Sequence, residues 1–299
     1  MYHLFIIASV VMFGGCFALK DQYRKRRGSG LKISMEASCI GSVAGFAVMT
    51  VFKGFSIELT AFTLIIALWK ALNGILFTFC SFKALDRINL SLFSLYTMLG
   101  GMILPFFQGI LFYGEEITWA KTVCVVFVVA ALLLTVKTGR KSGGGLYYAG
   151  IFILNGMSGV ISKIYTSSTL PKASAAGYSL WCSVMTIMLA SITWWVIASR
   201  EKRAAIATDE ATVQPDKKLC FQSVGIIAAS GSINTFANFL LVLALLHVDA
   251  SVQYPMVTGG TMIVSTLLSC FGRKKPSARE LVSIALAFAG MLSLFFIPI

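Results

Sequence analysis

The sequence has few of the residues on which soluble enzymes depend. Only 12% of its 299 residues are Asp, Glu, Lys or Arg, against about 25% in soluble proteins. Its two histidines, His3 and His247, stand far apart, and neither an HExxH pair nor a GxSxG motif occurs, which excludes the zinc and serine hydrolases that those motifs define. A GxxxxGK[ST] loop is also lacking, so the chain does not hydrolyse nucleotides as P-loop pumps do. No cofactor is predicted.

The seven cysteines contain no CxxC pair, and most of them lie inside apolar stretches. That distribution favours small buried hydrophobic side chains over disulfide or metal-binding roles. No metal site is predicted. The cysteines are Cys16, Cys39, Cys80, Cys124, Cys182, Cys220 and Cys270.

What the sequence does contain is apolar residues, which make up 57% of the chain and give it a mean hydropathy of +0.83. They are spread over the whole length, so no aqueous core could hide them, and the predicted partner is a lipid bilayer. Because a membrane-spanning helix needs about 20 apolar residues, the length suits ten spans. The predicted spans are residues 1–19, 33–52, 59–82, 90–112, 118–136, 146–165, 174–199, 220–246, 250–271 and 278–297.

The formal net charge of +13 would suggest nucleic acid in a soluble protein. Here 20 of the 25 Lys and Arg residues lie in or beside the loops that follow odd-numbered spans. Cytoplasmic loops of membrane proteins collect Lys and Arg, so we predict that both termini lie outside a cell membrane, and we predict no nucleic-acid partner. Residues 200–219 are predicted to form a polar linker.

The two halves of the chain resemble each other. Residues 96–102 (YTMLGGM) match residues 254–262 (YPMVTGGTM), and residues 112–116 (FYGEE) correspond to residues 271–275 (FGRKK). An odd number of spans per half inverts the second half, and inverted repeats are typical of secondary transporters. We therefore predict an all-α integral membrane protein with ten transmembrane helices in two inverted five-helix repeats. The repeats are predicted at residues 1–137 and 146–299, with a linker at 138–145.

Residues 99–121 (LGGMILPFFQGILFYGEEITWAK) resemble an EamA-type repeat. The whole chain is similar in the number and order of its spans to the ten-helix drug/metabolite transporter superfamily. Residues 90–137 match the repeat well, whereas residues 250–299 match it loosely because 273–275 replace its Gly-Glu step. The resemblance implies a transporter but no particular substrate. It also implies cytoplasmic termini, whereas the loop charges predict the opposite, and we follow the charges.

Lys70 lies near the centre of the third predicted span, where a cation costs at least about 2.5–3.5 kcal/mol. One interpretation is a positive charge that faces a cavity and either attracts a carboxylate or phosphate or releases a proton during a transport cycle, because a desolvated lysine loses its proton more easily. The alternative is a structural lysine that pairs with Glu36 or a carbonyl, or that reaches towards an interface.

Other polar and aromatic residues within the spans are candidates for a substrate path. Packing, hydrogen bonds between helices and interfacial aromatic belts are the alternative interpretations. The predicted substrate-binding residues are Trp69, Lys70, Asn73, Tyr96, Asn155, Tyr178, Trp181, Asn234, Asn238, Gln253, Tyr254 and Thr258.

Glycine pairs and a proline occur at corresponding places in spans four and nine. Interrupted helices at such positions are typical of transport sites, whereas close helix packing with a harmless kink is the alternative. The predicted helix-break residues are Gly100, Gly101, Pro105, Pro255, Gly259 and Gly260.

These patterns together predict a secondary transporter and no enzyme. It is expected to move a small organic metabolite, anionic or zwitterionic, such as an amino acid or related compound, by alternating access. A coupling ion, either a proton or sodium, is a candidate partner. An intramembrane enzyme acting on a lipid-like substrate is the main alternative, and a receptor or structural membrane protein is a third class.

Overall fold

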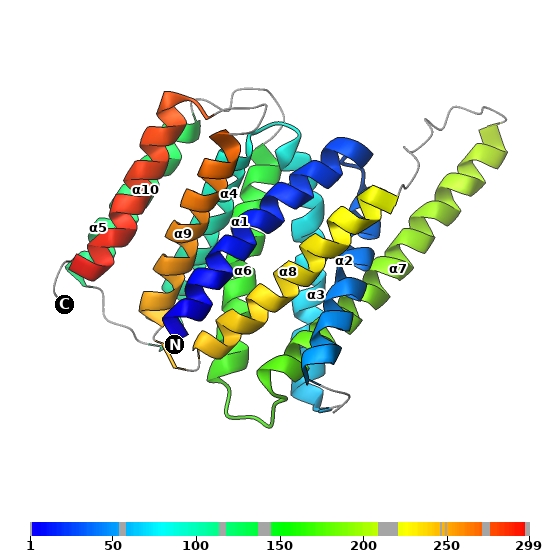
Figure 1. Ribbon diagram of the computed structural model, residues 1–299, viewed down its shortest axis with the longest axis horizontal. Helices are drawn as coiled ribbons and strands as arrows, with labels where there is room; N and C mark the ends of the chain where they lie inside the picture. The colour runs from blue at the N-terminus through cyan, green and yellow to red at the C-terminus, as the bar shows by residue number, and fades with distance from the viewer. Residues whose placement is uncertain are drawn as a thin grey trace.

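A computed structural model describes residues 2–53, 58–113, 118–136, 145–208, 221–245, 247–248, 250–270 and 276–296. Every regular element in this part of the chain is an α-helix (Figure 1), so the all-α prediction is confirmed. The helices are α1 Tyr2–Arg27, α2 Leu31–Lys53, α3 Ala61–Leu85, α4 Leu90–Tyr113, α5 Trp119–Val136, α6 Gly145–Ser167, α7 Ala175–Thr208, α8 Phe221–Leu245, α9 Ala250–Cys270 and α10 Ala278–Phe296.

Each helix coincides with one predicted span, but two run further than expected. Helix α1 continues to Arg27, beyond the predicted end at residue 19. Helix α7 continues to Thr208, so the first part of the predicted linker 200–219 is helical and that prediction is wrong there. Arg, Lys, Glu and Ala are all good helix formers, so these polar segments extend the apolar helices. Residues 209–219 of the predicted linker, like residues 138–144 of the linker between repeats, lie outside the described residues.

Several helices can cross a membrane. Six within the described residues have the length and apolar composition required, and α4 and α9 contain shorter apolar stretches. Large apolar side chains such as Ile65, Trp195 and Leu267 are exposed on the surface of the protein. An aqueous surface would disfavour such exposure, whereas lipid would not. The six helices are α1, α2, α3, α6, α7 and α8.

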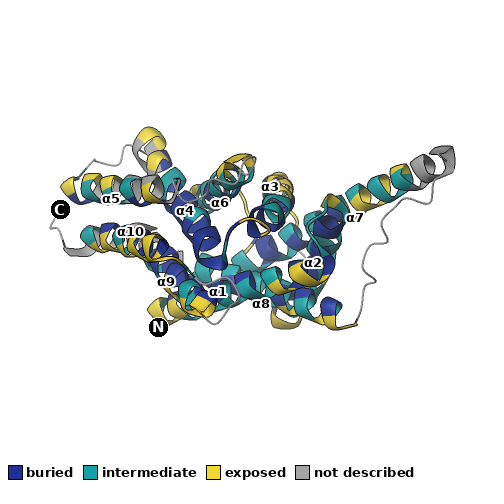
Figure 2. Cartoon of the chain, turned by 90° about the horizontal axis from the view of Figure 1, so that it is seen from above, coloured by how far each residue is buried: buried dark blue, intermediate teal, exposed yellow. Residues whose placement is uncertain are grey.

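The helices form two rows, which are seen end-on in Figure 2. One row is ordered α4, α6, α3, α7, and the other is ordered α9, α1, α8, α2, with neighbours in contact along each row. The rows meet at their edges, where α4 packs on α9 and α2 packs on α7. In the middle, α3 and α6 make few contacts with α1 and α8. Helices α5 and α10 pair with each other beyond one edge (Figure 2).

Glycines allow the helices within each row to approach closely. A Cβ atom added to Gly231 of α8 would lie 2.1 Å from the carbonyl oxygen of Gly41 in α2. A Cβ atom at Gly100 of α4 would lie 1.9 Å from the carbonyl oxygen of Phe152 in α6. Only glycine fits where two helix backbones are this close.

The predicted helix breaks do not occur, because α4 and α9 each form one continuous helix. The glycines instead make close contacts: Gly100 with Phe152, Gly101 with Asn155, and Gly260 with Val10. Gly259 is buried. Pro105 lies inside α4 and packs next to Gly159, and Pro255 lies within α9, its side chain outside the described residues. The alternative interpretation, close helix packing, fits this geometry.

One end of the protein, here called the basic end, carries a network of ion pairs. It includes the last turn of α1 and the start of α2. Arg27 binds Glu36 at 2.8 Å, Lys32 binds Glu201 at 2.8 Å, and Arg24 bridges Asp21 and Asp86. These pairs join α1 to α2 and to the residue that follows α3, and they join α2 to α7. Helix α1 begins, and α10 ends, at the opposite end (Figure 1).

Replacing Gly231 by alanine should destabilise the fold. The new methyl group would push α8 away from α2, and such overpacking costs about 1–3 kcal/mol. Thermal unfolding of the purified protein in detergent should show a lower Tm. The matched control is Gly225→Ala in the same helix, because a Cβ atom there meets nothing within 4 Å. Equal Tm values for the two variants would contradict the close contact between α2 and α8.

Candidate functional site

A cavity of about 340 Å³ lies between the two rows, where their middle helices separate. All helices of both rows contribute to its wall, and none of the described residues that line it comes from α5 or α10. Ligand pockets are typically about 300–1,000 Å³, so the volume suits a small molecule. The polar residues of the wall include Lys20, Ser38, Ser42, Lys70, Asn73, Thr78, Asn155, Ser158, Ser162, Tyr178, Ser179, Ser183, Thr186, Asn234, Thr235, Asn238, Gln253 and Thr258.

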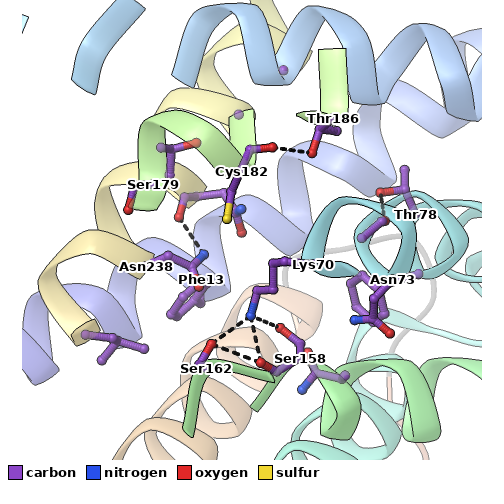
Figure 3. Close-up of a pocket in the computed structure, with 18 of the residues that line it drawn as sticks. Phe13, Lys70, Asn73, Thr78, Ser158, Ser162, Ser179, Cys182, Thr186 and Asn238 are labelled. Atoms are coloured by element: carbon purple, nitrogen blue, oxygen red, sulfur yellow. Dashed lines mark hydrogen bonds between the residues drawn. The ribbon is translucent and has the colours of Figure 1, made fainter. Parts of the chain in front are cut away.

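Lys70 reaches from the middle of α3 to α6. Its Nζ donates to the carbonyl oxygen of Ser158 at 2.7 Å, to Ser158 Oγ at 2.6 Å and to Ser162 Oγ at 2.9 Å (Figure 3). These bonds use all three ammonium donors. Within the described residues, no carboxylate forms a salt bridge with Lys70. Neutral hydroxyl and carbonyl groups therefore bind the Lys70 ammonium. No described carboxylate compensates its charge beside the cavity. The bond to the Ser158 carbonyl oxygen is one of the structural contacts predicted for Lys70. Glu36, the other predicted partner, binds Tyr23 and Arg27 instead.

Three side-chain amides on the cavity wall join one helix to another. Asn73 Nδ2 donates to the carbonyl oxygen of Leu154 at 2.8 Å, which joins α3 to α6. Asn155 Nδ2 donates to the carbonyl oxygen of Thr97 at 2.7 Å, which joins α6 to α4. Gln253 of α9 likewise donates to the carbonyl oxygen of Leu241 of α8 at 2.9 Å. The amides thus act between helices and still present polar atoms at the wall.

The structure brings eight of the twelve predicted binding residues to the cavity. Asn238 differs from the three amides above, because its Nδ2 donates to Asn234 within its own helix at 2.8 Å. The eight residues are Lys70, Asn73, Asn155, Tyr178, Asn234, Asn238, Gln253 and Thr258.

The other four predicted residues are not among those that line the cavity. Trp69 points away from it, and 41% of the residue is exposed on the outside of α3. Trp181 Nε1 donates to the carbonyl oxygen of Glu58 at 2.8 Å. The ring of Tyr96 stacks on that of Tyr148 at 5.7 Å between centroids. The side chain of Tyr254 lies outside the described residues.

Three polar atoms of the wall have unused hydrogen-bonding capacity. Ser38 Oγ, Tyr178 OH and Gln253 Oε1 are buried and have no partner within the described residues. Leaving such a group unpaired costs about 1–3 kcal/mol. A bound molecule or water in the cavity would satisfy them, so they are candidate contacts for a ligand.

Sequence reasoning missed Lys20, which it assigned to the loop after the first span. Helix α1 extends through this residue, and Lys20 lines the cavity. Small hydroxyl residues were missed too, although their spacing was a usable signal. Ser158 and Ser162 in α6, and Ser179 and Ser183 in α7, are each four residues apart and line the cavity, as expected for one helical face.

The lining of the cavity does not reach the basic end. On α1, α2, α3 and α8, its lining stops six or seven residues short of that end, or about 10 Å. A hydrophobic cluster that includes the fully buried Tyr23 and Phe82 lies there. Tyr23 OH donates to Glu36 at 2.6 Å, which links this cluster to the ion pairs. Towards the opposite end, the lining reaches Tyr178 and Gln253, three residues from the starts of α7 and α9.

The described side chains at the cavity are groups that bind molecules through hydrogen bonds and charge. Within the described residues, no group of three or more His, Cys, Asp or Glu side chains is placed to hold a metal ion. What the wall presents is ammonium, amide and hydroxyl groups next to aromatic rings. Such groups recognise a polar organic molecule through hydrogen bonds and charge.

Comparisons with known proteins define the fold and no more. No family model and no curated protein matches the chain. Among solved structures, 26 chains match. One of them, a crystal structure whose description names no activity, superposes with a TM-score of 0.59 at 16% sequence identity, covering 96% of this chain and 94% of its own. The arrangement of helices therefore recurs, over nearly its full length, in a protein of distant sequence.

Ser162→Ala should destabilise the protein by about 1–3 kcal/mol, because Lys70 would lose an acceptor for its buried ammonium. In a Lys70→Met background the same change should have little effect, since no ammonium is left to satisfy. Unfolding in detergent of both single variants and the double variant measures this coupling. Ser167→Ala, at the exposed end of the same helix, is the control. Equal destabilisation by Ser162→Ala in both backgrounds would rule out the Lys70 contact as its cause.

Proposed function

We propose that the protein is a secondary transporter that moves a small organic metabolite across a membrane by alternating access. The observation that carries this proposal is the cavity between the two rows. It presents polar side chains on a largely apolar wall, it is large enough for a small molecule, and its wall draws on helices from both halves of the chain. Transporter substrates are bound between repeats near the middle of the membrane.

The packing of the helices supports two inverted repeats. If each helix is exchanged for its counterpart five places away along the chain, the first row becomes the second row. The same exchange leaves the pairs α2–α7, α4–α9 and α5–α10 unchanged, because the two helices of each pair change places. Helix directions agree with this exchange. Ser9 of α1 contacts Ala237 and Cys16 contacts Ser230, so α1 and α8 are antiparallel. Their counterparts α6 and α3 are antiparallel too, with Asn73 bonded to Leu154 and Lys70 bonded to Ser162.

Ten spans and membership of the EamA-type drug/metabolite transporters belong to the same proposal. Within the described residues, each of the ten helices has 18 or more residues. Eighteen residues span about 27 Å at 1.5 Å per residue, which is close to the hydrocarbon thickness of a bilayer. The basic end would face the cytoplasm because Lys and Arg gather there. Both termini would then lie outside the cell membrane.

The off-centre position of the cavity lining fits an alternating-access cycle. In the present conformation, the cluster around Tyr23 and Phe82 and the Arg27–Glu36 pair separate the cavity from the basic end. Its lining extends furthest towards the other end. Movement of the rows about their contacts would open the basic end and close the opposite one. A proton or sodium gradient would supply the driving force.

Transport by the purified protein in lipid vesicles tests the proposal. A panel of labelled anionic, zwitterionic, neutral and cationic metabolites should include at least one solute that accumulates saturably, faster with an imposed proton or sodium gradient than without. Because Lys70 carries an uncompensated positive charge, Lys70→Ala should reduce uptake of anionic or zwitterionic solutes about tenfold. Lys25→Ala, on the exposed surface of α1, should not.

Two results would count against this proposal in different ways. Unchanged uptake by Lys70→Ala would remove the preference for anionic or zwitterionic solutes and leave the transporter assignment intact. Failure of every solute to accumulate above the level in protein-free vesicles would remove the transporter assignment itself.

Reporter fusions test the proposed orientation. Alkaline phosphatase, which is active only outside the cytoplasm, should be active when fused to either terminus. The same enzyme inserted among residues 209–218 should be inactive, because this segment follows α7 at the basic end. The reverse pattern would place the basic end outside and overturn the orientation without affecting the fold.

A further inference from the structure

Lys20 is a second cation on the cavity wall, and the described residues give it no counter-ion. Its Nζ lies 5.7 Å from the centroid of the Phe77 ring, a distance at which an aromatic face attracts an ammonium. In the described part of the chain, it makes neither a salt bridge nor a hydrogen bond. The adjacent carboxylate of Asp21 is bound by Arg24 and Lys25 instead.

The two lysines lie at different positions in the cavity along the axis of α3. Lys20 lies beside Phe77, whereas Lys70 lies seven residues earlier in the same helix α3. Seven residues of α-helix correspond to about 10 Å. Because α3 runs towards the basic end, Lys20 marks the end of the cavity nearer the ion pairs, and Lys70 marks a level nearer the opposite end.

Nothing in the described wall neutralises these charges. None of the described residues that line the cavity is Asp or Glu, so the cavity is doubly positive whenever Lys20 and Lys70 are both protonated. The wall also contains the phenyl rings of Phe13, Phe17 and Phe77. Uncompensated charges in a low-dielectric interior are unfavourable, and an anion that enters would relieve both of them at once.

We infer that the substrate is a dianion with an acidic group at each end of a largely apolar frame. One acidic group would pair with the Lys20 ammonium, and the other would bind near Lys70, where the Ser158 hydroxyl is placed to donate a further hydrogen bond. The phenyl rings would pack on the frame. This inference rests on the proposed transport function and specifies its substrate class. A substrate with a single acidic group would leave one lysine uncompensated.

Binding to the purified full-length protein in detergent tests this inference. Straight-chain α,ω-dicarboxylates with three to eight carbons are compared with monocarboxylates of the same length by isothermal titration calorimetry, at constant ionic strength. The affinity of the dicarboxylates should peak at one length. At that length it should exceed the affinity of the matched monocarboxylate about tenfold, because a second charge-assisted contact is made.

Variants locate the two contacts. Lys20→Gln should lower the affinity of the best dicarboxylate to that of the monocarboxylate, and Lys70→Gln should do the same. Lys25→Gln keeps the same change of charge in the same helix and should have no effect. If Lys20→Gln does not fold, Lys20→Met replaces it, and the length dependence of the wild-type protein decides on its own.

Several results would overturn the inference. These are equal affinity for dicarboxylates and monocarboxylates, no dependence on length, binding of sulfate as tight as that of the best dicarboxylate, or full dicarboxylate affinity in Lys20→Gln. Vesicle uptake of a neutral or cationic solute, with no dicarboxylate binding, would overturn it and leave the transporter proposal standing. Length-dependent dicarboxylate binding without uptake of any solute would support the dianion site and contradict the transporter proposal.

Discussion

Close backbone packing within each row of helices is the constraint on which the rest of the structure depends. At Gly231 and Gly100 the neighbouring helix backbones leave no room for a side chain. Because the helices within each row pack this tightly, the free volume of the protein lies between the two rows. The edge contacts α2–α7 and α4–α9 confine this volume to the middle of the rows. The positions of the glycines therefore determine where the cavity forms. The side chains that face the cavity do not have to fill its volume.

The positions of the helices could be predicted from the sequence because a membrane span requires a long apolar stretch. What the hydropathy pattern missed were helical extensions made of polar residues, at the end of α1 and in α7 beyond residue 199. The order of the helices within each row could not be predicted from the sequence. It depends on which faces meet across long sequence distances, as when Gly41 meets Gly231, and composition carries no such information.

The site was predictable where a polar residue interrupts an apolar span. Lys70 and the asparagines stand out for that reason, because an unpaired polar group in lipid is costly. Trp69 shows the limit, since it is next to Lys70 in sequence but on the outer face of α3, and only the packing of α3 tells the two faces apart. Lys20 was hidden for a different reason. It sits beside a run of charges at the end of α1 and resembles another loop residue.

The charges of α1 divide into two groups with different environments. Arg24, Lys25 and Arg27, at the basic end, each have a carboxylate partner. Lys20, one to two turns deeper in the same helix, faces a cavity whose described wall contains no carboxylate. Partners are thus supplied where a cation holds helices together and are missing where a cation faces open space. A structural ammonium would gain from an acidic neighbour as Arg27 does, but at Lys20 such a neighbour would compete with any anion that enters. A binding site for anions requires that the carboxylates pair with the cations at the basic end and stay away from Lys20, as they do in α1.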